Sequence, residues 1–195
     1  MARGRRIGLF GGTFDPPHTG HLGAAVAAKH SFRLDEVLLV VANDPWQKSG
    51  HQRLSAAHHR LAMVRLLVKD FDAIEASDLE ICRGGPSYTI ETVNELLAHG
   101  DEVTLIVGAD VAMGMCTWER YDELRELVEV AVVDRPGYAP PELPGWRFQR
   151  VETESLDISS SRVRDRIGDG SSTQATVPVA VRDYIDCHQL DWTEN

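Results

Sequence analysis

The chain is poor in cysteine, in basic residues and in long apolar runs, and each shortage excludes a class of protein. Cys82, Cys116 and Cys187 lie far apart and form no C-x-x-C pair, so we expect reduced thiols of a cytoplasmic protein rather than disulfides or zinc ligands. The 30 acidic residues outnumber the 20 basic ones, and the formal net charge of −10 disfavours nucleic acid as a partner. Glycines and an aspartate interrupt the sequence soon after its basic start, which argues against a signal peptide or a membrane span.

Strand-like apolar runs alternate with helical patterns along the 195 residues, of which 43% are hydrophobic. This alternation predicts the α/β class, with a Rossmann-like, doubly wound parallel sheet flanked by helices and a ligand crevice at the carboxyl ends of its strands. With no long linker or internal repeat, we expect a single domain over 1–195. Strands are expected at 7–10, 37–41, 73–76, 105–107, 130–133 and 147–151, and helices at 21–31, 55–69, 88–99, 121–127, 161–167 and 179–188.

A glycine-bearing turn joins the first expected strand to the first expected helix. Glycine lets the backbone approach an anion closely, and the N–H groups of a first helical turn point at it. His18 and His21 follow the turn three residues apart, so both can face one pocket. A Gly-Gly turn is common, this one is not the G-x-G-x-x-G fingerprint, and one histidine here would be a cap or a surface residue. Two imidazoles beside a phosphate cradle indicate chemistry on a phosphate.

The stretch 11–22, Gly-Gly-Thr-Phe-Asp-Pro-Pro-His-Thr-Gly-His-Leu, resembles the H-x-G-H signature of the nucleotidyltransferase superfamily, and in full form that of the bacterial nicotinate-nucleotide adenylyltransferases. Gly-Gly-Pro-Ser-Tyr-Thr at 84–89, Gly-Ala-Asp at 108–110 and Ile-Ser-Ser-Ser-Arg-Val-Arg at 158–164 are similar to further motifs of that family, with mild departures in the last. The resemblance implies a nucleotidyltransferase fold. It also implies transfer of the adenylyl group of ATP, accompanied by Mg²⁺, to nicotinate mononucleotide in NAD biosynthesis.

The resemblance assigns roles to individual residues. His18, His21, Lys48 and Arg164 would act on the phosphates, with Arg164 rather than Arg162 at the closing position of its motif. ATP would be bound by Gly11, Gly12, Thr13, His21, Gly108, Asp110, Ser159, Ser160, Ser161 and Arg164. Nicotinate mononucleotide would be bound by Asp15, Asn43, Lys48, Tyr88, Thr89, Trp118 and Arg135. Mg²⁺ would be held by ATP and water, with no ligand from the protein.

Several of these residues also have ordinary structural explanations. Ser87 and Asp110 each precede or open a helical pattern and would cap it, and Arg135 would form a surface salt bridge. In the helix expected at 55–69, Ser55 would be the cap, and the residues 58–60, His-His-Arg, would form an exposed polar face without partners for zinc.

The start of the helix expected at 88–99 bears on the choice of substrate. A helix start that prefers an anion favours a pyridine carboxylate at Tyr88 and Thr89 over the uncharged amide.

Two other functions remain open at this point. Pantetheine-phosphate adenylyltransferase shares the H-x-G-H turn and the Ile-Ser-Ser motif, but it lacks the stretch found at 84–89. A non-catalytic nucleotide sensor would bind both nucleotides without needing both histidines, Lys48 and Arg164. No serine, cysteine or lysine is paired with a base in a way that indicates a covalent intermediate, and a homo-oligomer is compatible with the sequence.

Overall fold

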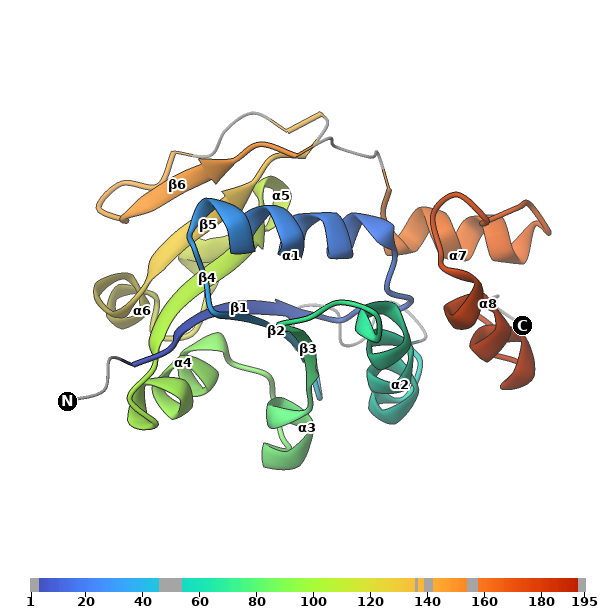
Figure 1. The fold of residues 1–195 in the computed structure, drawn as a ribbon, viewed down its shortest axis with the longest axis horizontal. Helices are drawn as coiled ribbons and strands as arrows, with labels where there is room; N and C mark the ends of the chain where they lie inside the picture. The colour runs from blue at the N-terminus through green and yellow to red at the C-terminus, as the bar shows by residue number, and fades with distance from the viewer. Residues whose placement is uncertain (1–3, 46–53, 136, 139–141, 154–157, 193–195) are drawn as a thin grey trace.

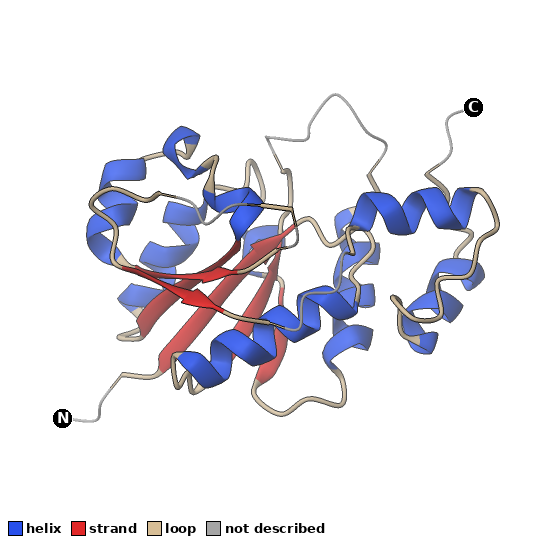
Figure 2. Ribbon diagram, turned by 90° about the horizontal axis from the view of Figure 1, so that it is seen from above, coloured by secondary structure: helices blue, strands red, loops and turns tan. Residues whose placement is uncertain are grey.

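The computed structural model describes residues 4–45, 54–135, 137–138, 142–153 and 158–192, and its centre is a six-stranded sheet (Figures 1 and 2). The strands are β1 Arg6–Gly12, β2 Glu36–Val41, β3 Ile74–Ser77, β4 Glu102–Gly108, β5 Glu129–Val133 and β6 Phe148–Val151. They are all parallel and follow the order β3-β2-β1-β4-β5-β6. The order reverses between β1 and β4, as in a doubly wound fold, so the expected fold class is confirmed.

Helices cover both faces of the sheet, and Figure 1 shows α1 and α4 on opposite sides of it. The helices are α1 Thr19–Ser31, α2 Ala57–Val68, α3 Leu79–Arg83, α4 Thr89–Ala98, α5 Ala109–Ala112, the 3₁₀ helix η1 Met115–Thr117, α6 Tyr121–Leu127, α7 Ser160–Gly168 and α8 Val179–Cys187. The six predicted helices begin and end within two residues of the observed bounds. The three that were not predicted, α3, α5 and η1, are each under two turns long, too short for a helical period to show.

The alternating side chains of the strands divide the core into two clusters. Along β2, Val37, Leu39 and Val41 join the cluster packed against α1, α2 and α8, whereas Val40 joins the cluster packed against α4 and α6. Each face of a parallel sheet is thus buried by its own layer of helices. The central strands are held on both sides, and their carboxyl ends form a fixed base for the loops that follow.

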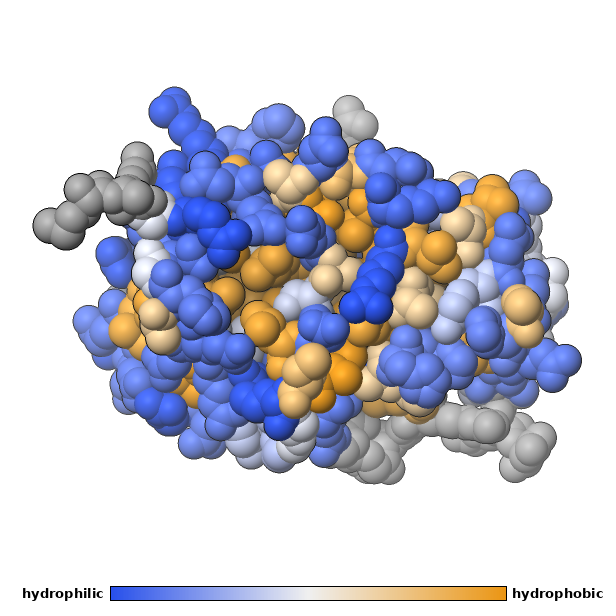
Figure 3. Space-filling view, turned by 60° about the horizontal axis from the view of Figure 1, so that its bottom comes forward, coloured by the Kyte–Doolittle hydropathy of each residue, from blue (hydrophilic) through white to orange (hydrophobic). Residues whose placement is uncertain are grey.

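The outer face seen in Figure 3 is largely hydrophilic. Figure 3 shows apolar side chains gathered around a hollow near the middle of one face, surrounded by hydrophilic ones. Within the described part of the chain, no helix has the length and apolar character needed to cross a membrane.

Candidate active site

Two neighbouring cavities open at the carboxyl ends of β1 and β4, where the strand order reverses. The larger has a volume of about 730 Å³ and the smaller about 210 Å³. Both are lined by the end of β1, from Phe10 to Gly12, by Thr13 and by Gly108. The crevice expected from the alternating pattern is therefore present, and one short backbone segment separates its two halves.

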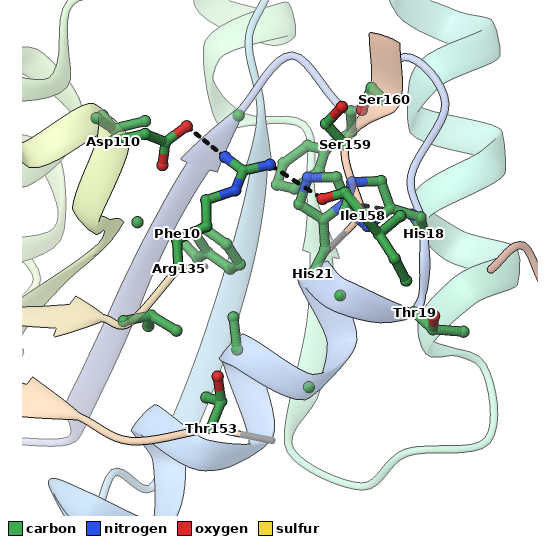
Figure 4. A pocket seen from close by; sticks show the side chains of 18 of the residues that line it. Phe10, His18, Thr19, His21, Asp110, Arg135, Thr153, Ile158, Ser159 and Ser160 are labelled. Carbon is green, nitrogen blue, oxygen red and sulfur yellow. Dashed lines mark hydrogen bonds and ion pairs between the residues drawn. The ribbon is translucent and has the colours of Figure 1, made fainter. Parts of the chain in front are cut away.

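His18 and His21 lie together in the larger cavity, with their rings stacked at a centroid distance of 3.7 Å and an interplanar angle of 23° (Figure 4). The backbone N–H of His18 donates a hydrogen bond to Nδ1 of His21, with an N···N distance of 3.1 Å. A backbone N–H can only donate, so Nδ1 must accept and the proton of the neutral ring lies on Nε2. The fold thereby fixes the tautomer in which His21 is a donor through Nε2.

His18 is a buried imidazole whose side chain is held neutral. The residue is only 3% exposed, and neither ring nitrogen has a hydrogen-bond partner among the described residues. Burial, followed by the positive charge of Arg135, lowers the pKa of His18 to about 3. A buried polar ring without a partner is unusual, because an unmade hydrogen bond costs about 1–3 kcal/mol. The ring is therefore suited to receive a polar ligand group in the cavity.

The start of α7 forms another wall of the larger cavity. Ser159, Ser160 and Ser161 all line it. Ser159 caps the helix by accepting a hydrogen bond from the backbone N–H of Arg162 at 3.2 Å, and Ser160 Oγ donates to the carbonyl of Pro16 at 2.9 Å. These contacts hold a helix N-terminus, with its partial positive charge, beside the two imidazoles.

Arg164 lies differently from the expectation that it, and not Arg162, reaches into the site. Arg162 is among the residues that line the larger cavity, whereas Arg164 Nη1 donates to the carbonyl of Asp15 at 2.7 Å and Nη2 to Ser161 Oγ at 3.2 Å. The guanidinium of Arg164 thus ties α7 to the histidine-bearing loop in this conformation.

Asp110 and Arg135 form an ion pair in the larger cavity, marked in Figure 4. Arg135 also donates through Nη2 to the carbonyl of Ile158 at 3.0 Å, while Oδ1 of Asp110 has no hydrogen-bond partner among the described residues. The expected salt bridge of Arg135 is thus present, and it lies in the cavity with both side chains partly buried. The residue that precedes α5 is Gly108, and no side chain of the described residues caps this helix, so the cap expected from Asp110 is not formed.

The smaller cavity is lined by Ser87, Tyr88, Thr89 and Trp118, at the start of α4 and after η1. Tyr88, the residue before α4, makes no side-chain cap hydrogen bond within the described structure. The expected cap by Ser87 is wrong, because Ser87 Oγ instead accepts a hydrogen bond from the backbone N–H of Asn43 at 2.8 Å. A helix N-terminus therefore opens into an aromatic-lined cavity without a side-chain cap.

Comparison with known proteins identifies the family of this chain. The model of the cytidylyltransferase-like family matches residues 9–166. A Bordetella petrii protein named "Probable nicotinate-nucleotide adenylyltransferase" is 39% identical over 195 residues, covering 95% of this chain and 98% of the relative. A Saccharopolyspora erythraea protein of the same name is 39% identical over 189 residues, covering 95% and 89%.

The chain belongs to the nicotinate-nucleotide adenylyltransferase family. It is therefore an enzyme of the nucleotidyltransferase class, and the relatives' names favour neither a pantetheine-phosphate adenylyltransferase nor a sensor. The Plasmodium falciparum nicotinic acid mononucleotide adenylyltransferase, in the structure complexed with NaAD, shares the fold with a TM-score of 0.80 at 19% identity, covering 95% of this chain and 97% of that one.

Three of the residues assigned to the mononucleotide by the family resemblance have partners within the protein in this structure. Asp15 is buried and accepts hydrogen bonds through Oδ2 from the backbone N–H of Ser55 at 2.9 Å and from Trp192 Nε1 at 3.0 Å. Asn43 donates through Nδ2 to the carbonyl of Gly85 at 2.9 Å. Arg135 lines the larger cavity, where it pairs with Asp110.

Lys48, also assigned by the family resemblance, lies outside the described residues. Tyr88, Thr89 and Trp118 do come together, in the smaller cavity.

Arg60 was predicted to lie on an exposed face, and that prediction is wrong because the residue is only 1% exposed. The predicted cap by Ser55 is also wrong. Helix α2 begins at Ala57, and the residue before it, Ala56, has no side chain that could cap it. A signal for Arg60 was present in the sequence. Met63, Val64 and Leu67 follow it at helical spacings of three, four and seven, so Arg60 belongs to the buried stripe of α2.

Proposed function

We propose that this enzyme transfers the adenylyl group of ATP to nicotinate mononucleotide, producing nicotinate adenine dinucleotide and pyrophosphate. Family membership supports the reaction class. The observation that carries the proposal is the pair of unequal cavities that share the wall Gly11–Thr13 at the carboxyl ends of β1 and β4. Two substrates bound on either side of this short backbone segment would bring their phosphates together beside it.

ATP would occupy the larger cavity, whose groups suit its parts. The available oxygen of Asp110 would accept a hydrogen bond from a ribose hydroxyl. The α-phosphoryl group would lie against His18 and His21, and the β- and γ-phosphates would lie at the start of α7 with Arg162 beside them. Arg164 would reach the phosphates only by leaving its bond to the Asp15 carbonyl. Thr13 and Gly108 would form the floor under the nucleotide.

Nicotinate mononucleotide would occupy the smaller cavity. Its carboxylate would accept hydrogen bonds from the backbone at Tyr88 and Thr89, where the helix start lacks a side-chain cap, and its ring would stack on Trp118. Lys48 would contribute charge to the phosphates. Because their polar groups hold other parts of the protein, Asp15 and Asn43 would support this site rather than bind the ligand.

The chemical step would be a direct displacement. An oxygen of the mononucleotide phosphate attacks the α-phosphorus of ATP, and the bond to the β-phosphate oxygen breaks as pyrophosphate leaves with the electron pair. The mononucleotide phosphate is already a nucleophile at neutral pH, so the protein contributes alignment and charge stabilisation. The neutral imidazoles of His18 and His21 would donate hydrogen bonds to the oxygens on which charge gathers.

Mg²⁺ would enter with ATP. The described residues bring together no group of three histidine, cysteine, aspartate or glutamate side chains suited to a metal, and Asp110 is paired with Arg135. We therefore expect Mg²⁺ to be held by ATP and water, and its charge would offset that of the phosphates.

Pyrophosphate release tests the proposal. The protein is mixed with ATP and Mg²⁺ and, in separate reactions, with nicotinate mononucleotide, nicotinamide mononucleotide or phosphopantetheine. We expect the fastest release with nicotinate mononucleotide and formation of the dinucleotide in equal amount. Release only with phosphopantetheine, or binding of both nucleotides without release, would refute it.

A further inference from the structure

Arg60 in α2 is buried, and its guanidinium holds the carbonyl oxygens of three separate loops. Nη1 donates to Thr13 O at 3.0 Å and to Ala42 O at 2.7 Å. Nη2 donates to Asn43 O at 3.1 Å, and Nε donates to Ser55 O at 2.9 Å. One planar group thus fixes the loop after β1, the end of β2 and the approach to α2 relative to one another.

Burying this charge is expensive, and the structure provides only partial compensation. Burial lowers the pKa of Arg60, whereas the nearby charge of Asp15 raises it. Among the described residues, the hydrogen bonds found for the guanidinium all go to backbone carbonyls. An apolar side chain of similar size would fill the space at a lower desolvation cost. The fixed fork of an arginine is instead suited to setting the relative positions of several carbonyls.

The loops that Arg60 joins are walls of the two cavities. Thr13 lines both cavities, and Ala42 lines the smaller one. The guanidinium therefore sets the distance between the segment that separates the two substrates and the segment that bounds the mononucleotide.

Asn43 extends this connection to the turn before α4. Its Nδ2 donates to Gly85 O at 2.9 Å, and its backbone N–H donates to Ser87 Oγ at 2.8 Å. The backbone N–H of Ser87 donates in return to Asp44 O at 3.0 Å. The position of the helix start in the smaller cavity is thus linked through Asn43 to Arg60.

We propose that Arg60 is a positioning residue for adenylyl transfer, holding the walls of both cavities so that the attacking phosphate and the α-phosphorus of ATP are aligned. This inference rests on the proposed function. It predicts that substitution of Arg60 lowers the rate at which bound substrates react (kcat) more than it weakens substrate binding, because small misplacements of reacting groups reduce the rate steeply.

The test compares Arg60→Lys and Arg60→Ala with Arg65→Ala, a matched control on the same helix. The side chain of Arg65 is 60% exposed and pairs with Asp78 at 3.2 Å. Folding is checked by circular dichroism, and kcat and both KM values are measured by pyrophosphate release. We expect kcat to fall at least tenfold in both Arg60 variants, with each KM within threefold of wild type and little change in Arg65→Ala. Guanidinium ion at low millimolar concentration should restore part of kcat in Arg60→Ala only.

Three results would overturn the inference. One is a folded Arg60→Lys with kcat within twofold of wild type. Another is a loss that lies entirely in the KM of one substrate. The third is failure of both Arg60 variants to fold, which would make Arg60 a requirement of the fold alone. An inactive wild-type protein in the same assay would instead refute the proposed function and remove the basis of this inference.

Discussion

Exchanging His21 for asparagine and for glutamine would separate the contributions of its two ring nitrogens. The amide of asparagine lies about where Nδ1 lies, so it can still accept the hydrogen bond from the backbone N–H of His18. It places no donor where Nε2 lies. Glutamine reaches about as far as Nε2 and keeps a donor there, but it loses the acceptor for His18.

The expected magnitudes differ between the two variants. Removing one well-placed donor from a transition-state oxygen reduces kcat by about 10²–10³, or roughly 2.7–4 kcal/mol. Losing the single hydrogen bond from the His18 backbone to Nδ1 should reduce the free energy of unfolding by about 1 kcal/mol. That is a small part of the 5–15 kcal/mol that is typical of a folded domain. His21→Asn should therefore be inactive but stable, and His21→Gln active but less stable.

The assay is initial pyrophosphate release with both substrates saturating, combined with urea unfolding of each protein. We expect kcat of His21→Asn to be at least 100-fold below wild type, and kcat of His21→Gln to stay within about tenfold. A His21→Asn protein with near-normal kcat, or the reverse order of the two variants, would refute the assignment of the cavity donor to Nε2 of His21.

Three further predictions follow from neighbouring features. Neutral His18 has a folded pKa of about 3 and an unfolded pKa of 6.5, so it contributes stability above pH 6.5 that is lost as the pH falls. By pH 5 the wild type should lose about 2 kcal/mol of unfolding free energy (1.5 pH units at about 1.36 each), a loss that His18→Gln avoids. Equal losses of the two proteins in urea unfolding would contradict this. A Cβ at Gly20 would lie 3.0 Å from Nδ1 of His18, whereas one at Gly23 would meet nothing within 4 Å. Calorimetry should therefore show a raised Tm for Gly23→Ala but no increase in Tm for Gly20→Ala, and the kcat of Gly20→Ala should also fall. The helix start at Thr89 should favour the acid mononucleotide over the amide by about 2- to 30-fold in kcat/KM, and added salt should reduce the ratio; a ratio of one would remove the anion site.

The sheet was predictable because its strands are apolar runs bounded by polar or glycine residues. All six strands appear within three residues of their predicted bounds, since burial on both faces leaves a signal in the local sequence. The placement of the two histidines was predictable for a related reason. His18 and His21 are neighbours in the chain, and a strand followed by a turn and a helix brings both to the carboxyl end of β1.

Other parts of the site depend on contacts between distant segments, which no local pattern encodes. The bond from Trp192 to Asp15 joins residues 177 positions apart, and the bond from Arg164 to the carbonyl of Asp15 joins residues 149 positions apart. Arg135 follows β5 and pairs with Asp110, which follows the neighbouring strand β4, and this pairing places Arg135 in the larger cavity. Local sequence reasoning correctly identified polar groups near the crevice but could not tell which of them the protein uses to hold itself together.

The position of the shared wall explains why adenylyl transfer suits this sheet. Helix α1, which follows β1, packs on one face of the sheet, whereas α4 and α6 pack on the other. The chain that leaves β1 and the chain that leaves β4 therefore turn to opposite faces, and a crevice opens between them. The wall between the cavities ends in Gly11, where a Cβ would meet nothing within 4 Å. A side chain at this position would therefore project into the open space between the two cavities. In the proposed reaction, a bare backbone at this point would let the attacking phosphate and the α-phosphorus approach each other. The two imidazoles and the start of α7 line the larger cavity beside it, and Arg60 holds the carbonyl of Thr13 at the other end of the wall.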